Sequence, residues 1–186
     1  MVRCGVTVML VGTLGALLVG AFPRGTSNKS CSLSKYRFPA PSELKAVQRM
    51  KEQFEDIMLL TNRKCNSRLF HRKWNTAELS VPDRITLVAA ELDLAITMLT
   101  KPTTQRLAET CQQPLAFLTQ VREDLRDCLS VEAPSHQPSG KLRHWLQKLD
   151  TAKKKESAGC LQASAILHIF QVLNDLRCAA QREDCT

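Results

Sequence analysis

Glycine and aromatic residues are scarce in this 186-residue chain, and their scarcity restricts its fold. Aromatic residues make up 5% of the sequence. Four of the 7 glycines precede Phe22, so only Gly25, Gly140 and Gly159 remain beyond it. Tight two-residue β-hairpins usually need glycine, which argues against a many-stranded sandwich. The hydrophobic content of 44% must therefore build a largely aliphatic core.

The sequence also lacks the patterns that carry enzymatic or metal chemistry. Its 4 histidines include no pair at the i, i+4 spacing of a helix face, and there is no H-E-x-x-H motif. No two cysteines form C-x-x-C, which argues against a zinc ribbon or a redox motif. There is no G-x-S-x-G motif and no Gly-rich phosphate loop. We therefore expect no enzymatic activity, no cofactor and no metal site.

The N-terminus has the pattern of a secretory signal peptide. Residues 4–22 carry no charge, Arg3 precedes them, and Val19-Gly20-Ala21 fits a small-residue cleavage site. We predict a signal peptide over 1–21 and a single domain over 22–186. The alternative is one membrane anchor, because an uncharged run of this length could span a bilayer. No later segment is as long and as free of charge, so the mature chain is expected to be secreted rather than membrane-embedded.

Cysteine usage fits export. The sequence has 8 cysteines, and cleavage after Ala21 would remove Cys4 and leave seven. Three disulfides and one unpaired thiol is the simplest account, and spacing alone does not choose the pairing. Cys111 lies on an apolar helical stripe, so we interpret it as a small core residue rather than a nucleophile. Asn28-Lys29-Ser30 is an N-glycosylation motif in a polar segment.

Hydrophobic periodicity predicts an all-α bundle of four long helices and one short helix. Apolar residues recur every three or four positions in five stretches, at about 42–58, 82–99, 104–129, 142–155 and 157–177. Pro114 is expected to kink or interrupt the third stretch. Residues 61–80 are expected to form a long basic crossover loop, and 22–40 an extended arm. Secreted bundles of this size are commonly signalling ligands, which is a fold-level analogy.

Basic residues exceed acidic ones by 26 to 18, and they gather in two places. One cluster lies in the loop, at Arg63, Lys64, Arg68, Arg72 and Lys73. The other lies in and after the short helix, at Lys141, Arg143, Lys148, Lys153, Lys154 and Lys155. These clusters are either solvated faces or a weak glycosaminoglycan-binding surface. Export and the scarcity of stacking aromatic residues argue against a nucleic-acid partner.

Several segments resemble the type III interferons (interferon lambda). The clearest are GKLRHWLQKL at 140–149 and KKESAGCLQAS at 154–164. Others are SCSLSKYRF at 30–38, CNSRLFHRKW at 65–74, RITLVAAELDLAITML at 84–99 and QQPLAFL at 112–118. The resemblance covers essentially the whole mature chain. It implies a disulfide-stapled helical cytokine of the interleukin-10 and interferon group.

The resemblance also implies a disulfide pattern. By the family pattern Cys31 pairs with Cys128, Cys65 with Cys160, and Cys178 with Cys185. Cys111 falls where the family has no matching cysteine, so it is left as a free thiol that could form a dimer.

The function implied by the resemblance is that of a secreted antiviral cytokine of innate immunity. Such a ligand brings together a specific chain of the interferon lambda receptor 1 type and a shared interleukin-10 receptor β chain, and so activates JAK-STAT signalling. A monomer is expected. The alternatives are a cytokine of the same fold with another receptor pair, and a cationic glycosaminoglycan-binding defence protein.

By the same resemblance the specific receptor contacts the first helix, the long loop and the last helix. The matching positions are Leu44, Gln48, Arg68, Trp74, Ile169 and Phe170. Phe170 is the strongest hot-spot candidate, although it also fits the core stripe. Trp74 either contacts the receptor or fastens the loop to the bundle. Trp145 is assigned to the core. The second receptor is expected on the first and third helices, without assigned residues.

Overall fold

A computed structural model of the chain describes residues 31–61, 65, 68–102 and 104–185. The predicted signal peptide at 1–21 and the predicted glycosylation site at Asn28 lie outside these residues. The described residues form six α-helices, three short 3₁₀ helices and no strand. The α-helices are α1 Pro41–Thr61, α2 Val81–Leu99, α3 Gln105–Glu132, α4 Gly140–Lys155, α5 Ala158–Leu167 and α6 Ile169–Gln181. The 3₁₀ helices are η1 Ser34–Arg37, η2 Thr76–Glu78 and η3 Arg182–Asp184. This is the all-α bundle that the periodicity predicts.

Four helices begin at a hydroxyl residue that caps their first turn. The hydroxyl oxygens of Ser80, Thr104, Ser139 and Ser157 each accept a hydrogen bond from the backbone N–H three residues later. Each bond satisfies an N–H group that has no partner within the helix. The chain therefore encodes the starts of α2, α3, α4 and α5 locally.

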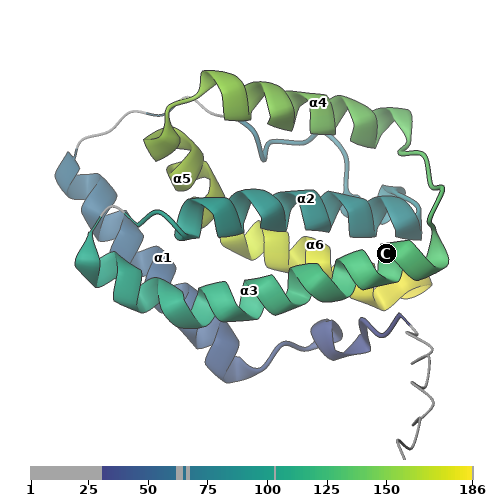
Figure 1. Ribbon diagram of the computed structural model, residues 1–186, viewed down its shortest axis with the longest axis horizontal. Helices are drawn as coiled ribbons and strands as arrows, with labels where there is room; N and C mark the ends of the chain where they lie inside the picture. Colours follow the sequence, from purple (N-terminus) through teal and green to yellow (C-terminus); the bar gives the residue numbers. More distant parts are fainter. Residues whose placement is uncertain (1–30, 62–64, 66–67, 103, 186) are drawn as a thin grey trace, which may run out of the picture.

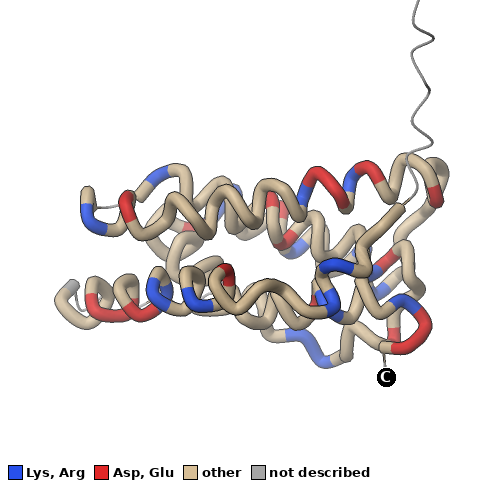
Figure 2. Tube along the Cα trace, turned by 90° about the horizontal axis from the view of Figure 1, so that it is seen from below, with Lys and Arg blue, Asp and Glu red and all other residues tan. Residues whose placement is uncertain are grey.

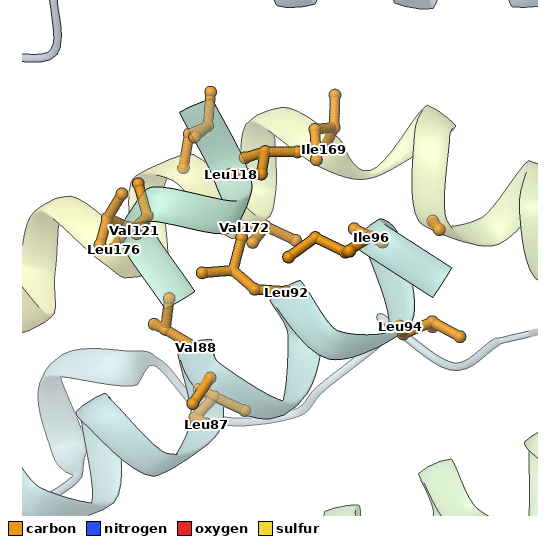
Figure 3. Packing of buried hydrophobic residues seen from close by; sticks show 14 of the residues in the cluster. Leu87, Val88, Leu92, Leu94, Ile96, Leu118, Val121, Ile169, Val172 and Leu176 are labelled. Atoms are coloured by element: carbon orange, nitrogen blue, oxygen red, sulfur yellow. The ribbon is translucent and has the colours of Figure 1, made fainter. Parts of the chain in front are cut away.

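Helix α2 forms the centre of the bundle and packs against α3, α5 and α6 (Figure 1). Its side chains Val88, Leu92 and Ile96 meet apolar residues of α3 and α6 in the core (Figure 3). Leu92 and Val172 are both fully buried. Burying each large aliphatic side chain contributes about 1.5–3 kcal/mol, so this aliphatic core is the main source of stability.

Helix α4 lies at one side of the bundle and contacts α2 (Figure 1). Leu142, Trp145 and Leu149 form its buried face, and charged residues occupy most of the remaining positions. The exposure of Trp145 is 3%, which confirms its assignment to the core.

The structure corrects the expected course of the chain at three places. The last predicted helix is divided into α5 and α6 at His168, where the Ser164 carbonyl accepts bonds from both the backbone and the ring of His168. Helix α3 is not interrupted at the buried Pro114, and as a whole it packs against α1 and α2. The arm is not fully extended, because η1 docks against α6 and buries Tyr36.

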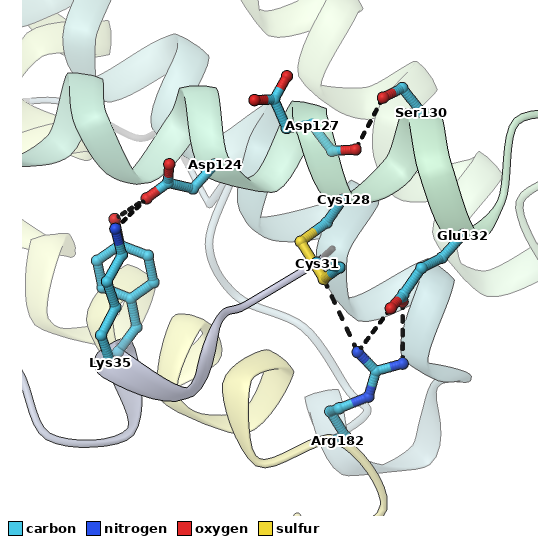
Figure 4. Close-up of a disulfide and its surroundings, with 9 residues drawn as sticks. Cys31, Lys35, Asp124, Asp127, Cys128, Ser130, Glu132 and Arg182 are labelled. Atoms are coloured by element: carbon cyan, nitrogen blue, oxygen red, sulfur yellow. Dashed lines mark hydrogen bonds and ion pairs between the residues drawn. A yellow bond between two sulfur atoms is a disulfide. The ribbon is translucent and has the colours of Figure 1, made fainter. Parts of the chain in front are cut away.

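Three disulfides, two between distant segments and one within the C-terminal end, have the pairing that the resemblance implies. They are Cys31–Cys128, Cys65–Cys160 and Cys178–Cys185. Figure 4 shows the first, which fastens the arm to α3 beside the Arg182–Glu132 ion pair. Cys111 is unpaired and buried. No helix in the described residues is both long and apolar enough to cross a membrane.

Candidate functional site

The segment from Arg68 to Ser80 is held between α4 and α6 by bonds to its backbone carbonyls. Trp145 Nε1 donates to the Leu69 carbonyl at 3.1 Å, and Gln171 Nε2 donates to the Phe70 carbonyl at 3.1 Å. Lys148 donates to the carbonyl of Arg68. The predicted long loop is therefore fixed on the bundle over this part of its length.

The buried side chain of Arg72 joins the same segment to two helices. Its guanidinium donates to Glu91 of α2 and to Asp175 of α6. The side chains of Arg72 and Glu91 are 5% and 0% exposed, so this ion pair is excluded from water. The Thr76 hydroxyl donates to the other oxygen of Asp175. The cluster joins the segment, α2 and α6 at one point.

Burial and the neighbouring charges both shift the pKa values of the side chains in this cluster. Burial raises the pKa of Glu91 well above the usual range of a carboxyl group, and the charge of Asp175 raises it further, against the opposing effect of Arg72. Burial alone would lower the pKa of Arg72, but Glu91 and Asp175 reverse that effect and raise it. One cation thus faces two carboxyl groups, and its charge does not cancel the effect of burial on the pKa of Glu91.

Trp74 lies over this cluster and beside α6. The guanidinium carbon of Arg72 lies 4.9 Å from the ring centre of Trp74 and 5.9 Å from that of Trp145. Trp74 also lines a surface pocket of about 400 Å³ together with residues of its own segment and of α6. The pocket residues are Arg72, Lys73, Trp74, Asn75, Thr76, Gln171 and Asp175. Trp74 is half-buried, so it covers the cluster and is still partly exposed at the surface.

The remaining candidate residues on the segment and α6 differ in exposure. Arg68 is exposed. Phe170 is half-buried at the edge of the core. Ile169 is 1% exposed, so its side chain is a core residue and is not available to a receptor. We therefore remove Ile169 from the candidate face and keep its neighbour Phe170.

The two candidates on α1 lie on a different helix from the others. Gln48 is exposed and donates to Glu52 one turn later, and Leu44 packs partly against the core. Helices α1 and α6 both pass behind α3 in Figure 1, so they share one side of the bundle relative to that helix. The structure thus brings Trp74 together with α6, and places Leu44 and Gln48 on a separate helix.

The sequence analysis missed several residues that shape this site. Phe70 stacks on His168 with ring centres 5.0 Å apart, and His71 meets the same imidazole edge-on at 6.0 Å. Gln171 holds the Phe70 carbonyl and lines the pocket. The only local signal for these residues was their place in the long loop and the last helix, two of the three elements that the resemblance assigns to the specific receptor.

A second, smaller pocket lies between α1 and α3. It has a volume of about 320 Å³ and is lined by Ala46, Arg49, Glu109, Thr110 and Gln113. The hydroxyl of Thr110 donates to Gln53 and joins the two helices beside it. The described residues contain no group of three side chains arranged to hold a metal ion.

Comparisons with known proteins place the chain among the interferons. Residues 28–182 match the interleukin-28A family model. The chain is 87% identical over 186 residues to interferon lambda-3 of Gallus gallus, covering 100% of both chains. It is 32% identical to interferon lambda-1 of Homo sapiens over 185 residues, covering 96% of this chain and 92% of the human protein. It is 31% identical to interferon lambda-2 of Mus musculus, covering 96% of each chain.

Proposed function

The chain belongs to the interferon lambda family of cytokines, and on that premise we propose that it is a secreted antiviral ligand that joins two receptor chains. One is a specific chain of the interferon lambda receptor 1 type, and the other is a shared chain of the interleukin-10 receptor β type. The ligand performs no chemistry in this proposal. It holds the two receptors at a fixed separation, so that their associated kinases activate STAT proteins.

The observation that carries the proposal is the fixed position of the Arg68–Ser80 segment against α6. The Arg72 cluster is buried, and the segment's carbonyls are held from both sides, so Trp74 is presented in one arrangement. A preorganised surface loses less conformational entropy on binding than a flexible loop does. We propose that Arg68, Trp74 and Phe170, with Leu44 and Gln48 on α1, contact the specific receptor.

We propose that the shared receptor binds at the smaller pocket between α1 and α3. Its lining combines Arg49 and Glu109 with the small residue Ala46, so a partner side chain could enter between opposite charges. Both receptor faces would then include α1, on different sides of that helix. This arrangement lets one rigid element set the separation of the two receptors.

The proposal is tested by STAT phosphorylation in matched epithelial cells with and without the specific receptor. Oxidised protein comprising residues 22–186 should give a response that disappears when that receptor is absent. A response that depends on another receptor pair would favour a different cytokine of the interleukin-10 group. Folded protein that binds cells without any receptor-dependent response would favour the cationic defence protein.

Processing of the N-terminus forms a separate part of the proposal. We propose that residues 1–21 are removed on secretion and that Asn28 is an acceptor for a glycan. Expression in epithelial cells should give secreted protein that begins at Phe22. N-terminal sequencing and the mass change on glycosidase treatment measure the two steps independently.

A further inference from the structure

Helix α4 carries a concentration of positive charge and lies outside the receptor faces proposed above. We propose that the exposed face of α4 binds a sulfated polysaccharide of the heparan sulfate class. The helix has 16 residues, of which one is acidic, Asp150. Six are basic: Lys141, Arg143, Lys148, Lys153, Lys154 and Lys155. Acidic and basic residues alternate along much of the described chain (Figure 2).

The spacing of these residues makes a linear array. Lys141, Lys148 and Lys155 are seven residues apart, which is close to two helical turns, so they share one stripe. The stripe extends over about 21 Å at 1.5 Å per residue. Because Lys148 donates to the carbonyl of Arg68, the exposed Arg68 lies beside the middle of α4. A straight row of cations matches the regular spacing of anions along a linear polysaccharide.

The positive charge on this face is available for a ligand. Within the described residues, Arg143, Lys153 and Lys155 are exposed and form no ion pair. Lys141 and Lys154 pair with Glu78 and Asp150, but their side chains are 53% and 72% exposed. Exposed pairs of this kind contribute little, so a sulfate group can replace the carboxylate at small cost.

The composition of the face distinguishes a polysaccharide from other polyanions. Trp145 is the helix's single Phe, Tyr or Trp residue, and it is buried, so no such ring is available for stacking on nucleic-acid bases. Leu142 and Leu149 are also buried and Leu146 packs partly against the core, so α4 has no fully exposed large apolar side chain to insert into a membrane. The three disulfides are typical of proteins in the oxidising extracellular space, where sulfated polysaccharides occur.

The test measures binding of the purified, oxidised protein to immobilised heparin over a range of salt concentrations. The variant R143Q/K153Q/K155Q removes three unpaired charges from α4, of which Lys155 lies on the stripe and Arg143 and Lys153 lie on other sides of the helix. It should weaken heparin binding by roughly tenfold or more at physiological salt and should reduce the salt dependence. The matched control, K101Q/R106Q/R177Q, removes three exposed charges that form no ion pair within the described residues. It should bind heparin within about twofold of the unmodified protein.

Three outcomes would overturn the proposal. Equal losses in the two variants would mean that binding follows net charge and not the α4 face. Tighter binding to single-stranded RNA than to heparin would assign the face to nucleic acid. Binding to phosphatidylserine vesicles at the same protein concentration, without binding to heparin, would assign it to a membrane surface. Retained far-ultraviolet circular dichroism in both variants excludes unfolding as the cause of any loss.

Discussion

Arg72 is the residue of the candidate site whose replacement should destabilise the protein most. It is the cation between the buried acids Glu91 and Asp175, and its removal would leave both carboxyl groups without a cation, with only the Thr76 hydroxyl still bonded to Asp175. We expect Arg72→Met to lower the free energy of unfolding by about 3–5 kcal/mol, because an unpaired buried charge costs more than the pair contributes. Urea unfolding followed by circular dichroism measures this loss. Arg68→Met, on the exposed part of the same segment, should stay within about 0.5 kcal/mol of the original stability.

The raised pKa of Glu91 predicts that the stability of the protein falls as the pH rises above the ordinary carboxyl pKa. Its pKa is raised in the folded state above the ordinary carboxyl value of 4.5 because it is buried beside Asp175. The folded state therefore holds this proton more tightly than the unfolded state does. The contribution of Glu91 to stability is present below pH 4.5 and is lost as the pH rises toward the folded-state pKa.

Glu91→Gln removes this titration while keeping the shape of the side chain. The stability of the variant, relative to the unmodified protein, should rise between about pH 5 and about pH 8. Urea midpoints at the two pH values give the comparison. A difference that stays constant would mean that Glu91 titrates alike in the folded and unfolded states.

The Arg72 cluster also marks a limit of reading the sequence. Arg72 was recognised only as one member of a basic loop, because its acidic partners lie 19 and 103 residues away. Neither Glu91 nor Asp175 breaks the helical pattern strongly enough to identify it as a partner. By contrast, Trp145 could be assigned to the core from its place on an apolar stripe, because that assignment depends on local periodicity.

Substitutions at two adjacent residues, Ile169 and Phe170, can distinguish a loss of core packing from a loss of the proposed receptor contact. Phe170→Ala should reduce affinity for the specific receptor by about 2 kcal/mol or more if the ring is a binding hot spot. The helical signal should be retained, because this side chain is half-buried at the core edge. Titration of the soluble receptor ectodomain by calorimetry measures the affinity.

Ile169→Ala provides the matched comparison. Its side chain is 1% exposed, so truncation should cost about 2–5 kcal/mol of stability and leave the affinity of the remaining folded protein nearly unchanged. If Phe170→Ala lost as much stability as Ile169→Ala while keeping its affinity, Phe170 would be a core residue only.

The unpaired thiol of Cys111 should be inert in the folded protein. It is 2% exposed, and burial raises its pKa to about 11. Because the thiolate is the reactive form, alkylation at neutral pH should be slow until the protein unfolds. Mass spectrometry after iodoacetamide treatment, with and without urea, measures this protection. Rapid labelling under native conditions would instead identify Cys111 as an accessible thiol that could link two chains.

At the scale of the elements, the helices with clear boundary residues were the most predictable. Ser80 and Pro82 mark the start of α2 in the sequence, and Ser139 caps α4. The division at His168 has no Gly or Pro beside it, so the 157–177 stretch was expected to be one helix. The continuity of α3 through Pro114 depends on packing against α1 and α2, which a local rule about proline does not include.

The disulfides constrain elements to different extents. Cys31–Cys128 spans 97 residues and fastens η1 near α3, whereas Cys178–Cys185 spans 7 residues at the C-terminal end. Chain entropy predicts that replacing the first pair with serine costs about 4–5 kcal/mol, and the second about 2 kcal/mol. Thermal unfolding of the two double variants measures the order. A larger loss for the short loop would show that local packing around Cys178 outweighs loop closure.

At the scale of the whole molecule, periodicity predicted an all-α bundle but not which faces remain exposed. The crossing of α1 and the placement of Arg68–Ser80 between α4 and α6 depend on contacts between residues far apart in sequence. The resemblance implied that the specific receptor contacts three segments, and the geometry joins the Arg68–Ser80 segment to α6 while Leu44 and Gln48 lie on the separate helix α1. The basic residues of α4 could be recognised in the sequence as a charge cluster. The alignment of Lys141, Lys148 and Lys155 along one stripe could be recognised only once the helix was known to span Gly140–Lys155.

The Arg68–Ser80 segment is bonded to both α4 and α6, and α2 also packs against both helices, which leads to a prediction about the independence of the two proposed binding faces. Phe170→Ala should weaken receptor binding without changing heparin binding, and R143Q/K153Q/K155Q should do the reverse. In the combined variant each loss should equal that of the single change to within about 0.5 kcal/mol, because the two sets of residues share no contact. Calorimetry with the receptor and salt elution from heparin measure the two affinities on the same samples. A larger deviation would mean that the segment transmits a change from one face to the other, because it is bonded to both α4 and α6.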